Sequence, residues 1–118
     1  MTRPAIPADL RSFIKQHIVS VPYLEALLLM RRAGSAGLDR ASLADALYVN
    51  EVAAAQLLAQ LSQAGLVQAL PAPGNLPHYI YAAQPPQAAL IDRLAEEYAN
   101  NLIGVSMLIH TTGMQTRF

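Results

Sequence analysis

A proline-rich break constrains the fold of this chain more than any other feature. The run PAPGNLP at residues 71–77 holds three prolines, which fix φ and lack a backbone N–H, so it suits neither a helix nor a strand interior. Residues 66–70 before it have a strand-like pattern, and residues 78–82 after it are rich in aromatic and branched side chains. The pattern therefore predicts a short two-stranded hairpin.

Helical patterns lie on both sides of this hairpin. The residue before a helix is often Asp, Asn or Ser, whose side chain accepts a hydrogen bond from the first turn, and glycine often follows the last residue. On these signals, together with apolar spacing, we expect Gly65 to end the fourth of five helices. The five are expected from Pro7 to His17, from a cap at Ser20 to near Gly34, from a cap at Asp39 through Leu47, from Glu51 (capped by Asn50) to Ala64, and from about Gln87 to Thr111.

The order helix, turn, helix, glycine, strand, proline-rich loop, strand is that of a winged helix-turn-helix, and it matches best in residues 39–82. Residues 43–47 resemble the motif's first helix. Leu58, Leu61 and the run GLV at residues 65–67 resemble the Leu-x-x-Leu-x-x-x-Gly-Leu-Val end of its recognition helix. The chain thus resembles the MarR-like and ArsR-like transcriptional regulators.

This resemblance implies one winged-helix domain over residues 1–118, mainly α with a small β wing. Helices at the N-terminus and a long C-terminal helix would flank the motif. In regulators of this type the terminal helices join two subunits, so the resemblance also implies a homodimer.

The distribution of charge departs from the pattern of a DNA-binding protein. Eight Lys and Arg balance eight Asp and Glu, and no Lys or Arg lies between Ala41 and Asp92, an interval that covers the recognition helix and the wing. Contacts from Lys and Arg to phosphate supply most of the affinity of DNA-binding proteins. Glu51 at the start of the recognition helix would oppose phosphate.

Other side chains are candidates for contact with DNA or with a partner protein. Glutamine can pair with an adenine edge in the major groove. Arginines beside the motif can hold phosphate, although they can equally cap helices or pair with neighbouring carboxylates. The candidates are Asn50, Gln56, Gln60 and Gln63 on or next to the recognition helix, and Arg31, Arg32 and Arg40 beside it.

The end of the last predicted helix is apolar on nearly every side. A small domain offers little material to surround such a helix, and Gly104 and Ser106 are small enough for another helix to approach closely. We therefore expect a homodimer, although a helix buried within its own domain is the alternative. The predicted interface residues are Leu102, Val105, Met107 and Ile109.

Composition excludes several other classes of protein. With 53% hydrophobic and 14% charged residues the chain is not disordered, and without cysteine it has neither disulfides nor a thiolate site. Its three histidines are too scattered for a metal site, and no motif for phosphate binding or nucleophilic catalysis occurs. The sequence therefore predicts no enzyme, no cofactor and no metal. Because neither a signal peptide nor an apolar run of about 18 residues is found, we expect a cytoplasmic protein without membrane contact.

Two hypotheses on function follow. Because the recognition helix lacks positive charge, the first is a non-enzymatic winged-helix regulatory module that acts mainly through protein–protein contacts as a homodimer. The alternative is a sequence-specific DNA-binding transcriptional regulator of the MarR-like type. There Gln56 and Gln60 would contact bases, and the three arginines would contact phosphate, although charge predicts weak binding to duplex DNA.

Overall fold

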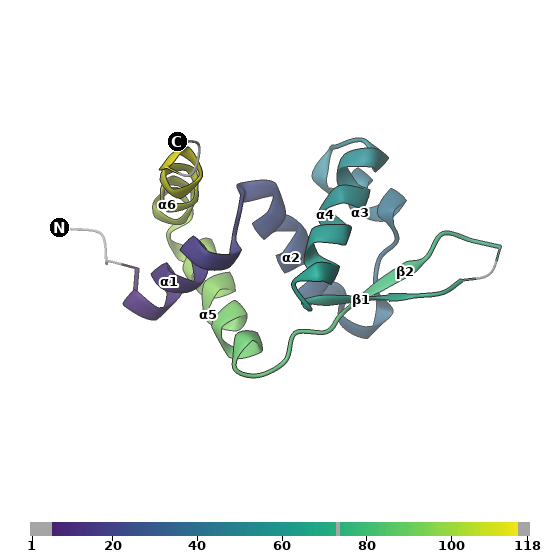
Figure 1. Cartoon of the computed structure of the whole chain (residues 1–118), viewed down its shortest axis with the longest axis horizontal. Helices are drawn as coiled ribbons and strands as arrows, with labels where there is room; N and C mark the ends of the chain where they lie inside the picture. The colour runs from purple at the N-terminus through teal and green to yellow at the C-terminus, as the bar shows by residue number, and fades with distance from the viewer. Residues whose placement is uncertain (1–5, 73, 116–118) are drawn as a thin grey trace. The chain divides into compact units, whose positions relative to one another are not determined.

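The computed structural model describes residues 6–72 and 74–115, which form helices and one two-stranded sheet (Figure 1). Residue 73 of the predicted loop and residues 1–5 and 116–118 of the predicted domain lie outside this description. The elements are α1 (Ala8–His17), α2 (Val21–Ala33), the 3-10 turn η1 (Gly34–Ala36), α3 (Arg40–Leu47), α4 (Glu51–Gln63), β1 (Val67–Leu70), β2 (His78–Tyr81), α5 (Gln87–Asn100) and α6 (Leu102–Gln115). The prediction of a mainly α fold with a small β wing is confirmed.

The described residues divide into two compact units. One, here called the wing unit, comprises residues 22–84 and so contains the whole predicted motif. The other, here called the terminal unit, comprises residues 6–21 and 85–115 of the described chain. That residues 1–118 act as a single domain stays a prediction.

Side-chain caps begin the two helices of the motif, as predicted. Asp39 accepts a hydrogen bond at Oδ1 from the backbone N–H of Ser42 (2.8 Å), which satisfies a donor at the start of α3. Asn50 does the same for α4 through the N–H of Ala53, also at 2.8 Å. The two helices pack against each other, and Leu43 and Leu58 are fully buried.

The end of α4 confirms the role predicted for Gly65. Its φ is +77°, in the left-handed region that favours glycine. The N–H of Gly65 donates to the carbonyl oxygen of Ser62 (3.0 Å), and the N–H of Leu66 donates to that of Leu61 (3.0 Å). These two bonds form a Schellman motif, which turns the chain from α4 directly into β1.

The wing is an antiparallel hairpin in which Val67 pairs with Tyr81. The sequence did not predict a third segment that joins it: Leu38 and Tyr79 exchange two backbone hydrogen bonds of 2.9 Å. Gly37 permits this contact, because a Cβ there would lie 2.5 Å from the carbonyl oxygen of Tyr79. The bridge attaches the wing to the residues just before α3.

The terminal unit holds α1 against α5 and α6. Arg93 of α5 donates to the carboxylate of Asp9 in α1, in one contact at 3.1 Å and in a second, shorter one. This ion pair holds the pKa of Asp9 below its usual value. Buried apolar side chains fill the unit, among them Leu10, Ile14, Ile91, Leu94, Val105 and Ile109.

The prediction of one long C-terminal helix from about 87 to 111 is wrong, because the chain breaks at Asn101. The backbone N–H of Asn101 donates to the carbonyl oxygen of Glu97 (2.7 Å) and closes α5, while its Oδ1 accepts from the N–H of Gly104 (3.2 Å) and starts α6. Gly104 leaves room for this cap, since a Cβ there would lie 2.6 Å from the Asn101 side chain. Across the described ranges, no helix combines the length and the apolar character needed to cross a membrane.

Candidate nucleic-acid interface

Helix α4 buries one face and leaves the other exposed. Ala54, Leu58 and Leu61 are fully buried in the wing unit. The opposite side, here called the outer face, carries side chains that recur three and four residues apart and are exposed or half-buried. It comprises Val52, Ala55, Gln56, Ala59, Gln60 and Gln63. This face is therefore neutral, with alanine and valine between glutamines.

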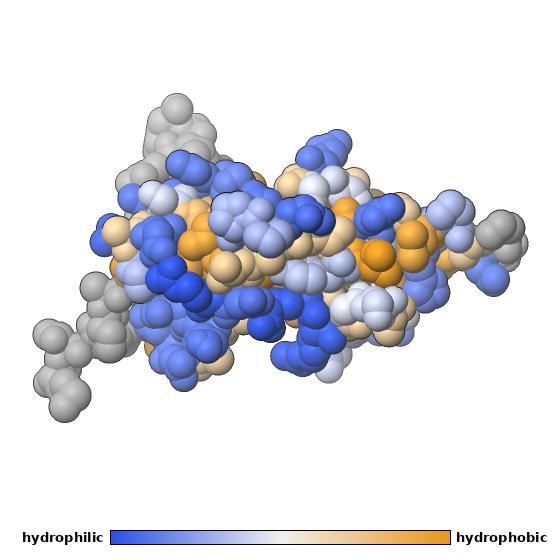
Figure 2. Space-filling view, turned by 90° about the horizontal axis from the view of Figure 1, so that it is seen from below, coloured by the Kyte–Doolittle hydropathy of each residue, from blue (hydrophilic) through white to orange (hydrophobic). Residues whose placement is uncertain are grey.

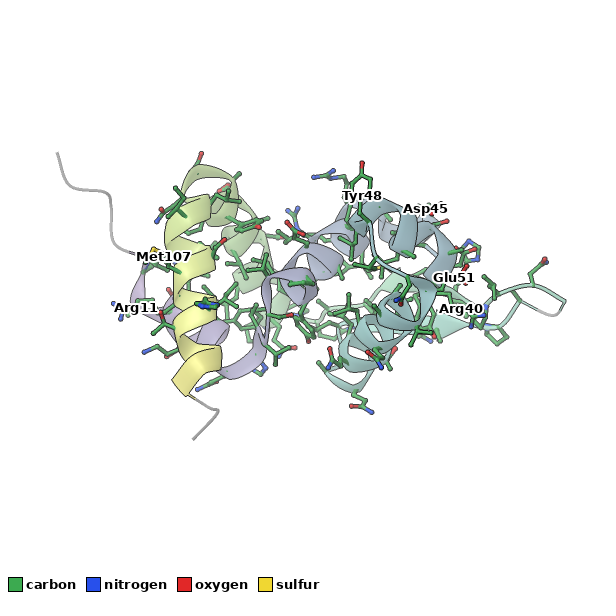
Figure 3. The ribbon with its side chains drawn as sticks, turned by 90° about the horizontal axis from the view of Figure 1, so that it is seen from above. Arg11, Arg40, Asp45, Tyr48, Glu51 and Met107 are labelled. Atoms are coloured by element: carbon green, nitrogen blue, oxygen red, sulfur yellow. The ribbon has the colours of Figure 1, made fainter. Side chains whose placement is uncertain are left out.

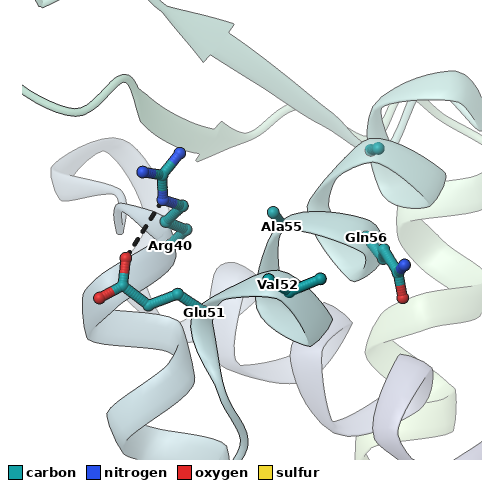
Figure 4. A pocket seen from close by; sticks show the side chains of 6 residues that line it. Arg40, Glu51, Val52, Ala55 and Gln56 are labelled. Carbon is teal, nitrogen blue, oxygen red and sulfur yellow. Dashed lines mark hydrogen bonds and ion pairs between the residues drawn. The ribbon is translucent and has the colours of Figure 1, made fainter.

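A hollow of about 470 Å³ opens on the first half of this face (Figure 4). The α4 side of the hollow consists of Glu51, Val52, Ala55, Gln56 and Ala59, and Arg40 of α3 completes it. Seen from below, the part of the chain that forms the wing unit shows apolar surface beside polar side chains (Figure 2). Val52 is the largest apolar side chain that lines the hollow, and 69% of this residue is exposed.

An ion pair stands at the edge of this hollow. Arg40, the first residue of α3, has its Nε 3.2 Å from Oε1 of Glu51, the first residue of α4 (Figures 3 and 4). Both side chains are about half exposed, so the pair adds little to stability. The pair changes the expected effect of Glu51 on phosphate, because the positive charge of Arg40 offsets the negative charge of Glu51. The four N–H donors on the terminal nitrogens of Arg40 lie outside this bond.

The other residues predicted to contact DNA or a partner protein lie outside the hollow. Asn50 accepts at its side-chain oxygen from the N–H of Ala53 and so caps α4. Gln60 and Gln63 are exposed farther along the helix. Arg31 and Arg32 end α2, where Arg31 is half-buried and Arg32 is exposed. Neither lines the hollow, so the hollow joins Gln56 to one arginine rather than to three.

Tyr48 lies in the turn between α3 and α4, and the sequence analysis missed it. It adopts left-handed backbone angles (φ 58°, ψ 42°), and 95% of the residue is exposed (Figure 3). A residue with a side chain loses about 1–2 kcal/mol in this conformation, and such strain collects at functional sites. The sequence carried one signal for it. The short connection between α3 and the cap of α4 contains no glycine, so a residue with a side chain has to adopt the left-handed conformation there.

The wing unit has a formal charge of −1. It contains three arginines (Arg31, Arg32 and Arg40) and four carboxylates (Glu25, Asp39, Asp45 and Glu51). The N–H and side chain of Ser42 lower the pKa of Asp39, so this carboxylate stays ionised at neutral pH. Non-specific attraction to phosphate is therefore weak for this unit.

The predicted dimer residues lie on two different sides of α6. Leu102 and Met107 are exposed, at 52% and 62%. Val105 and Ile109 are buried at 0% and 2%, so in this structure they face the interior of the chain and are inaccessible to a second copy. Ile103, at 58% exposed, takes their place on the outside. Because α6 is apolar all round, its sequence did not reveal which side faces inward.

No group of three or more His, Asp or Glu side chains suited to a metal ion occurs in residues 6–72 and 74–115. The described site consists of neutral amides, small apolar side chains and one ion pair. This chemistry suits contact with another molecular surface.

Comparison with known proteins identifies the fold. No protein-family model and no curated protein sequence matches the chain. Rv1404 from Mycobacterium tuberculosis matches with a TM-score of 0.56 at 21% identity, and covers 80% of this chain. This chain spans only 65% of the length of Rv1404.

Two structures of MarR from E. coli match as well. A cysteine-to-serine mutant has a TM-score of 0.59 at 17% identity over 85% of this chain and 82% of that one. The wild-type apo form has a TM-score of 0.56 at 16% identity over 96% and 87%. The chain therefore has a MarR-like winged helix-turn-helix fold, and the predicted resemblance is confirmed.

These matches overturn the first hypothesis on function. The prediction of a module that acts mainly through protein contacts is wrong, because the similarity to MarR favours the alternative, a DNA-binding regulator. The lack of positive charge on the recognition helix does not exclude binding to DNA. Charge governs non-specific affinity, whereas base contacts that carry sequence specificity need hydrogen-bonding and apolar groups.

Proposed function

We propose that the chain is a non-enzymatic, cytoplasmic transcriptional regulator that binds duplex DNA as a homodimer. The observation that carries the proposal is the outer face of α4. This exposed helical surface follows the turn after α3 and precedes the wing formed by β1 and β2. The major groove of B-DNA is wide enough to admit one helix, so α4 is placed to enter it.

Each part of the wing unit then has a role. Gln56 and Gln60 contact base edges, because both are exposed and carry an amide that donates and accepts. Arg40 contacts the phosphate backbone through its terminal nitrogens while Glu51 holds its Nε. Arg32, which is exposed at the end of α2, adds a second phosphate contact.

Dimerisation proceeds through the exposed side of α6. Leu102, Ile103 and Met107 present three large apolar side chains on one helix, and exposing them to water is unfavourable. A second copy of the same helix covers them and extends the DNA-binding surface to two half-sites. Half-sites of helix-turn-helix dimers lie about one helical turn of DNA apart.

Selection from a random duplex library at low salt tests this function. The protein is expected to enrich a sequence with two half-sites, and fluorescence anisotropy on that duplex measures its affinity. Gln56→Ala weakens binding by roughly tenfold, because one good base contact is worth about 1–3 kcal/mol. Gln16→Ala in α1 is the matched control, since this exposed glutamine belongs to the terminal unit and leaves affinity unchanged. A folded dimer that enriches no sequence would refute the proposal.

A further inference from the structure

We infer that the outer face of α4 recognises adenine·thymine base pairs, with glutamines pairing to adenine and small apolar side chains packing on thymine methyl groups. The inference rests on the proposed function and specifies its ligand. It follows from the chemistry and the placement of five residues: Val52, Ala55, Gln56, Ala59 and Gln60.

The groups that select guanine and cytosine are either absent from α4 or engaged at the edge of the hollow. Guanine is recognised chiefly by Arg or Lys on O6 and N7, and α4 contains neither residue. Arg40 is the one guanidinium lining the hollow, but it belongs to α3, and the proposed function assigns its terminal nitrogens to the phosphate backbone. Glu51 is the carboxylate that can accept from the N4 amino group of cytosine, and its ion pair with Arg40 occupies it.

Adenine finds a matching partner in each exposed glutamine. The amide oxygen of glutamine accepts from N6 of adenine while its NH₂ donates to N7. Gln56 lines the hollow, and Gln60 follows one turn later on the same face. A separation of four residues is about 6 Å along the helix axis, so the two amides can contact different base pairs.

Thymine alone among the bases carries a methyl group in the major groove. Val52, Ala55 and Ala59 give the hollow an apolar lining of short side chains, which lets the helix approach the bases closely. Val52 is 69% exposed and loses that exposure when a methyl group packs on it. The neutral outer face, with methyl groups beside two amides, therefore fits an A·T-rich half-site and leaves the polar edge of a G·C pair unsatisfied.

Base analogues in the selected duplex test this inference on the whole 118-residue chain. Replacing a contacted thymine by uracil removes only the methyl group, and should weaken binding about fourfold, the effect of losing one buried methyl-sized group. Replacing a contacted adenine by 7-deazaadenine removes the N7 acceptor and should weaken binding about tenfold. Gln56→Ala should abolish the 7-deazaadenine effect at one adenine and leave the uracil effects in place.

Val52→Ala gives the complementary result, because it should reduce the uracil effect at one thymine and leave the 7-deazaadenine effects unchanged. Both substitutions are at exposed positions, so thermal unfolding should stay at the wild-type temperature. Gln16→Ala in α1 should retain every analogue effect.

The outcomes separate the inference from the proposed function. Selection of G·C-rich half-sites, or equal affinity for thymine and uracil duplexes, would overturn the inference while DNA binding stands. Failure to bind any duplex at 50 mM salt by a folded dimer would instead overturn the proposed function.

Discussion

At the scale of single residues, two glycines are required for different physical reasons. Gly65 has a φ of +77° with open space where a Cβ would stand, so only its backbone conformation demands glycine. Gly37 has a φ of +70° and in addition lies against the carbonyl oxygen of Tyr79. The sequence predicted the first from its place after a helix. It could not predict the second, since the contact joins residues 42 positions apart.

Alanine substitutions should separate these two causes. Gly65→Ala is expected to lower the free energy of unfolding by about 1–2 kcal/mol, the cost of a left-handed residue with a side chain. Gly37→Ala should cost more, because the wing must also move away from the new Cβ. Urea denaturation measures both losses. Equal losses would mean that the Leu38–Tyr79 bridge does not constrain Gly37.

Glu51→Gln tests the ion pair at the edge of the hollow. The change removes the negative charge at the first residue of α4 and replaces the carboxylate that holds the Nε of Arg40 by a weaker, neutral acceptor, so binding to duplex DNA should strengthen several-fold at low salt. The log–log salt slope should steepen by up to about 0.9 for each additional phosphate that the protein neutralises. Anisotropy titrations at several salt concentrations measure both effects.

Glu96→Gln is the control, because Glu96 is an exposed carboxylate in the terminal unit. It makes the same change of charge outside the wing unit. If the two variants bound DNA equally, the pair at the hollow would have no special role in binding.

At the scale of secondary structure, local signals predicted the motif well. Asp39, Asn50 and Gly65 mark helix ends through bonds to residues within five positions, so each is visible in a short stretch of sequence. The break at Asn101 is also local, but the apolar run after it obscured the cap. The inner and outer sides of α6 depend on packing with α1 and α5, which no short stretch encodes.

The cap of α3 should make stability depend on pH. Asp39 has a pKa below its ordinary value of 3.8, because the N–H of Ser42 stabilises the ionised form. A carboxylate whose pKa is lower in the folded state stabilises the fold fully above its unfolded pKa. That contribution is lost as the pH falls through the lowered folded value.

Asp39→Ala should therefore cost about 1 kcal/mol at pH 7, and less in acid. Asn50→Ala removes a neutral cap, so its cost should stay the same at both pH values. Urea denaturation of the wild type and both variants at pH 7 and pH 3 measures these differences. A constant cost for Asp39→Ala would show that its charge does not contribute.

At the scale of the whole molecule, the proposed regulator requires a dimer formed through α6. Ile103→Asp and Met107→Asp place a charge on the exposed side, so they should yield folded monomers. Val105→Asp buries an unpaired charge and should unfold the chain, at a cost of several kcal/mol. Light scattering after size exclusion, with thermal unfolding alongside, distinguishes the two results. A dimer that survives both exposed substitutions would place the interface elsewhere.

The salt dependence of DNA binding tests the central claim most directly, since it separates attraction to phosphate from contact with bases. A dimer with three arginines per wing unit should show a log–log slope no steeper than about −5, and should bind random duplex at 150 mM salt with a Kd near or above about 10⁻⁴ M. The selected duplex should bind on the order of 10³-fold tighter at the same salt. A steeper slope, or equal affinity for selected and random duplexes, would contradict recognition of bases by a neutral helix.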